Sequence, residues 1–137
     1  MSSEIVPLQG PQKAVKMAIS TLPKPCWDDV GIVLGKRANC SKVISPRDVR
    51  KMMRLTLAQM GALVAAIMSL SGNPRAPYHR STVAHWETPA RKSRMGARVI
   101  EVYKAIIKEC VRAASGGRYA AQIQNTRKWR VTLRRIA

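Results

Sequence analysis

The longest uncharged stretch of the chain, residues 55–74, lies between Arg54 and Arg75 and constrains the fold more than any other feature. A membrane span needs about 20 consecutive apolar residues, whereas a run of about 10–14 is typical of a helix buried in a protein core. Polar residues and a proline interrupt the stretch, namely Thr56, Gln59, Ser69, Ser71, Asn73 and Pro74. We therefore predict a buried helix here and no association with a membrane.

The rest of the chain is strongly basic. Its net charge is +18, from 25 Lys and Arg against 7 Asp and Glu. Residues 1–70 carry 10 basic and 4 acidic side chains (+6), and residues 71–137 carry 15 and 3 (+12). Such an excess repels itself and favours a polyanionic partner. Nucleic acid is the expected partner, because neutralising its phosphates releases counterions.

The cysteines and histidines predict no metal or cofactor. Three widely spaced cysteines, Cys26, Cys40 and Cys110, do not form a disulfide framework, and we expect free, buried thiols. His79 and His85 lack the spacing of a zinc site. The chain shows no catalytic set of side chains, so we expect a protein that is not an enzyme. The N-terminus is neither basic nor apolar, so we expect no signal peptide and a cytoplasmic location. With nucleic acid as the expected partner, we expect the protein to be nucleoid-associated.

Caps and breakers predict short helices over much of the chain. Residues 1–12 read as an arm, residues 13–22 as a helix and residues 38–44 as a loop. Residues 26–37 fit either a helix beginning near Asp28 or a short strand over residues 30–35. Ser45 and Pro46 are suited to the N-cap and first position of a helix over 46–54. Thr56 and Gln59 have capping-box spacing before a helix over 57–70.

Two further helices and a strand complete the expected elements. One helix covers 79–88, and another covers 94–114 with Ser93 as its cap. The second carries an apolar stripe at helical spacing, made of Val99, Val102, Tyr103, Ile106, Ile107 and Cys110. Residues 127–135 alternate between apolar and polar, which predicts a strand. That strand must pair with residues 30–35, with a second copy of itself, or with nothing until a partner binds.

Two of these segments carry a known pattern. "LTLAQMGALVA" (55–65) and "RSTVAHWE" (80–87) resemble the two helices of the Cro/C1-repressor (XRE-like) class of helix-turn-helix DNA-binding proteins. The resemblance covers roughly residues 46–108, and residues 66–77 are an insertion where that class has a tight turn. Met60 and Val64 on the first helix are spaced to pack on Val83 and Trp86 of the second. The resemblance also implies that Gly61 allows close helix approach and that Glu87 is structural.

The candidate DNA-binding residues follow from this resemblance. The second helix, placed in the major groove, offers side chains suited to base edges and phosphates: His79, Arg80, Ser81, Thr82 and His85. Three residues stand where the class grips the DNA backbone: Arg91, Lys92 and Arg94. Arg75 in the insertion and Thr56 at the start of the first helix complete the set.

The resulting expectation is a mainly α fold, a helix-turn-helix bundle of about five helices with a C-terminal β-strand or arm. We divide the chain into an N-terminal arm with a short helical or strand segment (1–44), a DNA-binding domain (45–115) and a basic C-terminal strand or arm (116–137). The expected function is sequence-specific binding of double-stranded DNA by a homodimeric, repressor-like transcriptional regulator. By analogy, its short length and high charge suit a protein encoded by a phage or a mobile element.

The alternative is a non-enzymatic RNA-binding or structural packaging protein of ribosomal or nucleocapsid type. It explains basic residues that are spread along the whole chain. Trp27 and Trp129 then fit either core or dimer anchors, or platforms for base stacking. A charged stripe on the 94–114 helix is either a solvated face or a further phosphate contact, and consists of Arg98, Glu101, Lys104, Lys108 and Arg112.

Overall fold

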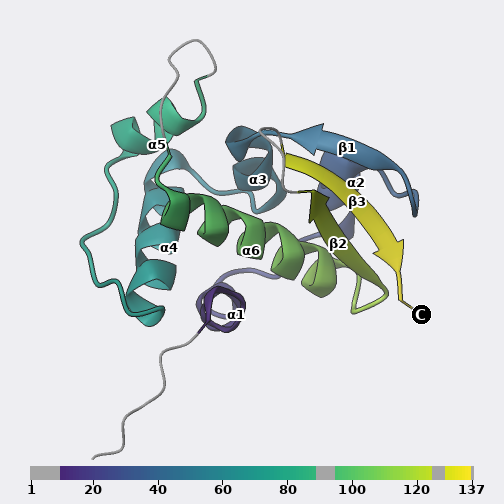
Figure 1. The fold of residues 1–137 in the computed structure, drawn as a ribbon, viewed down its shortest axis with the longest axis horizontal. Helices are drawn as coiled ribbons and strands as arrows, with labels where there is room; N and C mark the ends of the chain where they lie inside the picture. Colours follow the sequence, from purple (N-terminus) through teal and green to yellow (C-terminus); the bar gives the residue numbers. More distant parts are fainter. Residues whose placement is uncertain (1–9, 89–94, 125–128, 137) are drawn as a thin grey trace, which may run out of the picture.

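A computed structural model describes residues 10–88, 95–124 and 129–136. This part of the chain forms six helices and three strands (Figure 1): α1 Pro11–Ile19, α2 Trp27–Leu34, β1 Ser41–Ile44, α3 Pro46–Met52, α4 Leu57–Leu70, α5 Arg80–Trp86, α6 Ala97–Ala114, β2 Tyr119–Gln124 and β3 Trp129–Arg135. The expected mainly α fold with C-terminal strands is confirmed. The segment 26–37, which the pattern left open between helix and strand, contains a helix.

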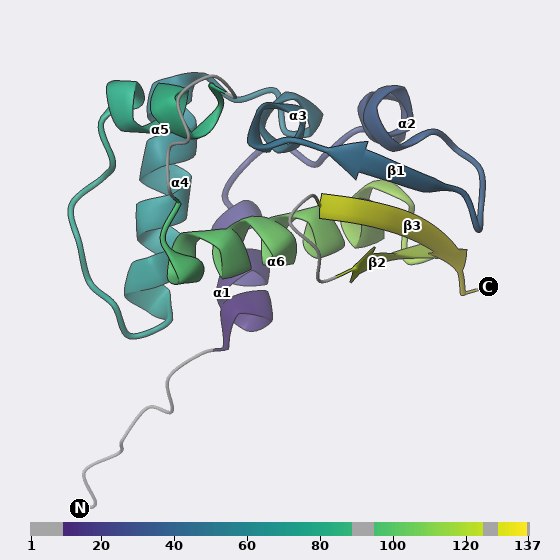
Figure 2. The same cartoon turned by 45° about the horizontal axis from the view of Figure 1, so that its top comes forward.

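The long helix α6 runs through the middle of the molecule (Figure 1). It packs against α1, α2, α3, α4 and β2, with α4 at its N-terminal end and the sheet beside its C-terminal half (Figure 2). All six residues of the predicted apolar stripe are buried. α6 begins at Ala97 with Gly96 as its N-cap, three residues later than expected. Ser93, the expected cap, lies outside the described residues.

The three strands form an antiparallel sheet in the order β1-β3-β2. The expected pairing of the C-terminal strand is wrong, because β3 pairs with β1 and β2 of its own chain and residues 30–35 belong largely to α2. The loop expected at 38–44 is also wrong over its second half, which is β1. β1 has only four residues, one of them buried, so it shows no alternation. It is held by β3, for example through a hydrogen bond between the hydroxyls of Ser41 and Thr132 (2.7 Å).

Capping boxes start α3 and α4 where the sequence predicted them. The Ser45 hydroxyl accepts a hydrogen bond from the Asp48 backbone N–H, and the Asp48 carboxylate accepts one from the Ser45 N–H. Thr56 and Gln59 make the same reciprocal pair at α4. These bonds satisfy N–H groups that have no partner within the helix. The bounds of α4 agree with the prediction, and α3 ends two residues early at Met52.

Within the described residues, no single helix is long and apolar enough to cross a membrane. Only α3 and α4 taken together reach that length and composition, and they are bent by 95° at their junction.

One hydrophobic core joins all parts of the chain. It contains Val15 from α1, Val49 from α3, Val64 from α4, Ile106 from α6 and Val131 from β3. The ranges 1–44, 45–115 and 116–137 therefore share a single core. The thiol of Cys110 is buried in it, and burial raises its pKa to about 12. The expectation of buried thiols is wrong for the other two cysteines, which are exposed.

All six aromatic side chains lie in ring contacts. Tyr78, Trp86, Tyr103 and Trp129 form a continuous series with centroid separations of 4.9, 6.1 and 5.5 Å, and the two remaining rings, Trp27 and Tyr119, stack at 5.1 Å. The series crosses the core from α5 through α6 to β3. Trp129 is buried. It therefore serves as a core residue, and its ring is not accessible for stacking with a base.

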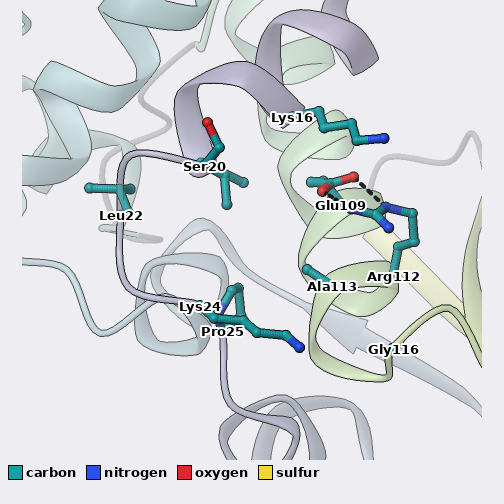
Figure 3. A pocket seen from close by; sticks show the side chains of 10 residues that line it. Lys16, Ser20, Leu22, Lys24, Pro25, Glu109, Arg112, Ala113 and Gly116 are labelled. Carbon is teal, nitrogen blue, oxygen red and sulfur yellow. Dashed lines mark hydrogen bonds and ion pairs between the residues drawn. The ribbon is translucent and has the colours of Figure 1, made fainter.

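The acidic side chains of the described residues bind partners within the fold. Of the six in the described residues, five are in ion pairs, and the sixth, Asp48, belongs to the capping box of α3. One of these pairs joins Arg112 to Glu109 along α6 (Figure 3). The excess of positive charge is therefore left on exposed Lys and Arg side chains.

Tyr103 provides a test of the core. Its side chain is fully buried between Trp86 and Trp129, and its hydroxyl has no hydrogen-bond partner among the described residues. Burial raises the pKa of this hydroxyl. We expect Tyr103→Phe to change the free energy of unfolding by less than about 1 kcal/mol, because no hydrogen bond is lost. Tyr103→Ala should lower it by about 3–5 kcal/mol. Urea denaturation measures both, and equal losses would mean that the hydroxyl has a partner.

Candidate nucleic-acid interface

α5 packs against the N-terminal half of α4. The apolar residues expected at this contact are buried, namely Met60, Val64 and Val83, while Trp86 is half-buried. Gly61 lies at the closest approach, where a Cβ atom added to it would stand 2.2 Å from the backbone oxygen of Tyr78. We expected Gly61 to allow close approach of the two helices, but the backbone that approaches it is Tyr78, just before α5.

The inserted residues do not move α5 away from α4. α4 continues to Leu70, and the segment 71–79 then returns along the helix. The Arg75 N–H donates to the Ser69 hydroxyl near the end of α4 (3.4 Å), and the Tyr78 N–H donates to the Gly61 carbonyl (3.3 Å). The Tyr78 hydroxyl also contacts the sulfur of Met68 (3.2 Å). The insertion therefore closes on itself, and α5 begins beside the first half of α4.

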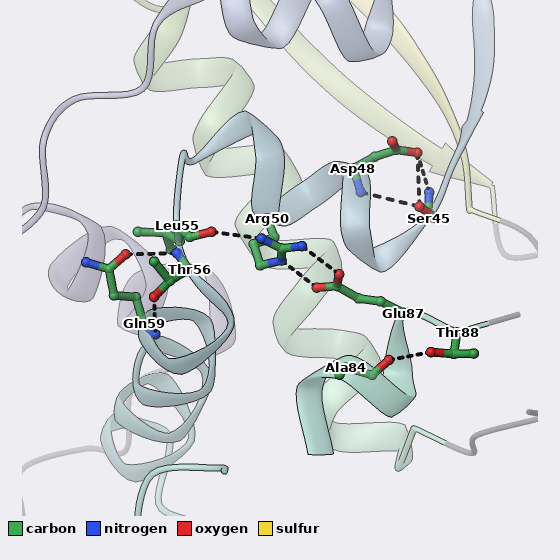
Figure 4. A network of polar contacts seen from close by, with 9 residues as sticks. All are labelled: Ser45, Asp48, Arg50, Leu55, Thr56, Gln59, Ala84, Glu87 and Thr88. Carbon is green, nitrogen blue, oxygen red and sulfur yellow. Dashed lines mark hydrogen bonds and ion pairs between the residues drawn. The ribbon is translucent and has the colours of Figure 1, made fainter. Parts of the chain in front are cut away.

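A partly buried ion pair fixes the other end of α5 (Figure 4). Glu87, the C-cap of α5, accepts hydrogen bonds from Nε (2.7 Å) and a terminal nitrogen (2.9 Å) of Arg50 on α3. Another nitrogen of Arg50 donates to the Leu55 carbonyl in the α3–α4 turn (3.1 Å). The side chains of Arg50 and Glu87 are 19% and 7% exposed. Hydrogen bonding to Glu87 raises the pKa of Arg50, so the guanidinium stays protonated.

Between these two anchors, α5 presents polar side chains to solvent. His79, Arg80, Ser81 and His85 are exposed, and Thr82 is half-exposed. His79 caps the helix, because its Nδ1 accepts the Ser81 backbone N–H (3.1 Å) and lies 2.8 Å from the Ser81 hydroxyl. Two of the candidate side chains therefore also hold the first turn of α5, while the Arg80 side chain projects from it without such a role.

The remaining candidates fall into three groups. Thr56 is exposed at the start of α4, and its hydroxyl oxygen serves the capping box. Arg75 stacks its guanidinium on the Tyr78 ring at 3.3 Å from the centroid. Because the Tyr78 ring in turn contacts Trp86 of α5, with 4.9 Å between the ring centroids, the Arg75 guanidinium lies next to the aromatic residues that support α5. Arg91, Lys92 and Arg94 lie outside the described residues.

The resemblance implies a structural role for Glu87, but nothing in the sequence points to Arg50 as its partner. Arg50 is one of several Lys and Arg residues near α3, and 37 residues separate it from Glu87. A buried carboxylate needs a cation because burial removes it from water, but that rule does not say which of the basic residues supplies it.

The described residues contain no cluster of three or more His, Cys, Asp or Glu side chains that could hold a metal ion. Comparison with protein-family models, with curated proteins and with solved structures gives no match to this chain.

The Gly61 contact predicts a strongly destabilising substitution. Ala favours a helix interior over Gly by about 1 kcal/mol, but at position 61 its methyl group would collide with the Tyr78 carbonyl, which is backbone and cannot rotate away. We expect Gly61→Ala to lower the free energy of unfolding by about 1–3 kcal/mol, as overpacked cores do. Gly96→Ala is the control, because its added methyl meets no atom within 4 Å. A thermal melt in which both variants behave alike would contradict the contact.

The Arg50–Glu87 pair predicts that losing one of its partners destabilises the fold more than losing a partner of an exposed ion pair. Arg50→Met leaves the Glu87 carboxylate buried without a partner, so we expect a loss of about 3–5 kcal/mol in the free energy of unfolding. Arg50→Met with Glu87→Gln should cost less than the sum of the two single changes. Arg54→Met is the matched control, because it removes an ion pair to Asp29 in which the arginine is 77% exposed, worth at most about 1 kcal/mol. Equal losses for Arg50→Met and Arg54→Met would show that burial does not matter.

Proposed function

We propose that the protein is a sequence-specific double-stranded DNA-binding regulator of repressor type, with α5 in the major groove. One observation carries the proposal: a short helix, fixed at both ends, presents Arg80, Ser81 and His85 to solvent. The Tyr78–Gly61 contact fixes its start and the Arg50–Glu87 pair fixes its end. A reading helix needs such rigidity, since base contacts depend on side chains held in register.

The proposed mechanism divides the contacts between bases and phosphates. Arg80 is suited to a bidentate contact with guanine, and the hydroxyls of Ser81 and Thr82 suit base edges or phosphate. The exposed start of α4 at Thr56 would face the sugar-phosphate backbone of the DNA, as the first helix does in helix-turn-helix proteins. The basic residues 91, 92 and 94, which follow α5 in the chain, are proposed for the same task. The bound protein, located in the cytoplasm, would repress transcription by blocking access to a promoter.

A homodimer is part of this proposal, because helix-turn-helix dimers read two half-sites. Two copies that each carry +18 repel one another over most of their surface. A groove of about 620 Å³ between α1 and α4 has only uncharged residues along it, among them Met17, Leu22, Ala62, Ala66 and Leu70. We propose that a second copy of the chain packs there.

The second candidate function is nonspecific binding of RNA or packaging of nucleic acid. The observation that favours it is the wide distribution of exposed basic side chains, which occur on α1, β1 and β3 as well as on α5. A packaging protein needs such a distribution and does not need a reading helix.

Selection from a random duplex library at about 150 mM salt separates the two functions. A regulator should enrich one consensus, with each mismatch costing about 1–3 kcal/mol. For a dimer, the consensus should consist of two related half-sites. Selection of no consensus, with equal binding of single strands, would overturn the regulator and support the packaging function.

Substitutions in α5 test the helix itself. Arg80→Ala combined with Thr82→Ala should lower specific binding by at least about tenfold, because each good base contact contributes about 1–3 kcal/mol. Nonspecific binding should fall only slightly. Arg37→Ala, an exposed arginine before β1, removes the same charge elsewhere and should leave the preference for the consensus unchanged. Equal loss of specific and nonspecific binding in the α5 variant would place recognition outside α5.

A further inference from the structure

A second basic surface lies between α1 and the C-terminal half of α6. Two pockets adjoin there, of about 460 Å³ and about 790 Å³, and both are lined by Lys16, Glu109 and Arg112. Lys24 lines the first pocket and reaches it from the segment after α1 (Figure 3). Two more lysines line the second. We call this surface the α1–α6 trough and define it by its five cations, Lys13, Lys16, Lys24, Lys108 and Arg112.

The trough has a large excess of positive charge. All five of its cations are exposed. Its one carboxylate, Glu109, is 4% exposed and accepts two hydrogen bonds from Arg112, at 2.8 and 2.5 Å. That acid is therefore already neutralised by one of the five cations. Four lysines remain with no acidic group lining either pocket to balance them.

The stability of the two helices does not account for Lys13 and Lys108. Lys13 lies in the first turn of α1, which contains no acidic residue, and a positive charge at a helix N-terminus is unfavourable. Lys108 lies four residues after Lys104 and four before Arg112 on α6, and like charges at that spacing destabilise a helix. Lys16 and Arg112 stand in last turns, where cations are favourable. At Lys13 and Lys108, the charge therefore opposes local stability.

The trough is separate from the reading helix. Both views place α1 and the C-terminal half of α6 away from α5, with the body of α6 between them (Figures 1 and 2). A duplex seated on α5 would therefore leave the trough open.

We propose that the α1–α6 trough binds the phosphate backbone of nucleic acid without reading its sequence, so that one chain holds two nucleic-acid segments. Exposed lysines in a recess are suited to phosphates spaced along a strand, and this contact gives affinity through counterion release. The inference goes beyond the proposed function, because it does not depend on how α5 reads bases.

A bridging experiment tests the proposal with the full chain. One duplex is immobilised, the protein is added, and capture of a second, labelled duplex is measured at about 100 mM salt. We expect Lys13→Gln/Lys16→Gln/Lys108→Gln to reduce capture of the second duplex by at least about tenfold, since three phosphate contacts are lost. Retention of the protein on the first duplex should change much less.

The matched control removes the same charge elsewhere. Arg37→Gln/Lys42→Gln/Arg130→Gln neutralises three exposed cations around the sheet, and it should keep most of the bridging. Equal bridging by the two triple variants would overturn the proposal. Circular-dichroism melts of both verify folding before the comparison.

Two further measurements separate this proposal from the failure of α5 as a reader and from a site for small anions. Arg80→Ala/Thr82→Ala should retain nonspecific capture through the trough, so failure of α5 as a reader would leave this inference standing. Inorganic phosphate alone is titrated against the wild type and the trough variant. Binding of phosphate that is lost in the variant, while bridging persists, would make the trough a site for small anions and overturn its assignment to nucleic acid.

Discussion

The pairing of Arg50 with Glu87 is the interaction on which the arrangement of the helices depends. A guanidinium on α3 bonds at once to the end of α5 and to the carbonyl of Leu55 in the α3–α4 turn. The planar guanidinium of Arg50 thereby connects α3, the α3–α4 turn and the end of α5. Its shape allows two parallel hydrogen bonds to one carboxylate. Removing either partner would leave the other charge without its counter-charge in a partly buried place, which is unfavourable.

Local rules made most of the helices predictable. Ser45 with Asp48 and Thr56 with Gln59 are signals contained within four residues, and they mark the starts of α3 and α4. The apolar stripe of α6 repeats at 3 and 4 residue intervals over the whole helix, so its burial could also be expected. The resemblance to a helix-turn-helix pattern likewise rested on short segments, and the packing of Met60, Val64 and Val83 follows from their spacing.

Features that depend on distant residues could not be predicted in the same way. β1 is a strand because Ser41 meets Thr132, 91 positions away, and nothing within its four residues signals that partner. The C-terminal strand was recognised by its alternation, but its neighbours were not. The same limit applies to the candidate site, where Arg50 finds Glu87 across 37 residues. The trough likewise exists only because folding brings α1 beside α6.

The return of residues 71–79 along α4 has a consequence for how this fold accommodates change. Because Tyr78 is anchored at Gly61, the loop over residues 71–77 has one end fixed at the end of α4 and the other fixed beside Gly61. The entropy of closing a flexible loop grows only with the logarithm of its length, so doubling it costs roughly 0.6 kcal/mol. Residues could therefore be inserted or grafted around Pro74 without changing how α5 is seated. Residues 71–77 are therefore a suitable place for added sequence.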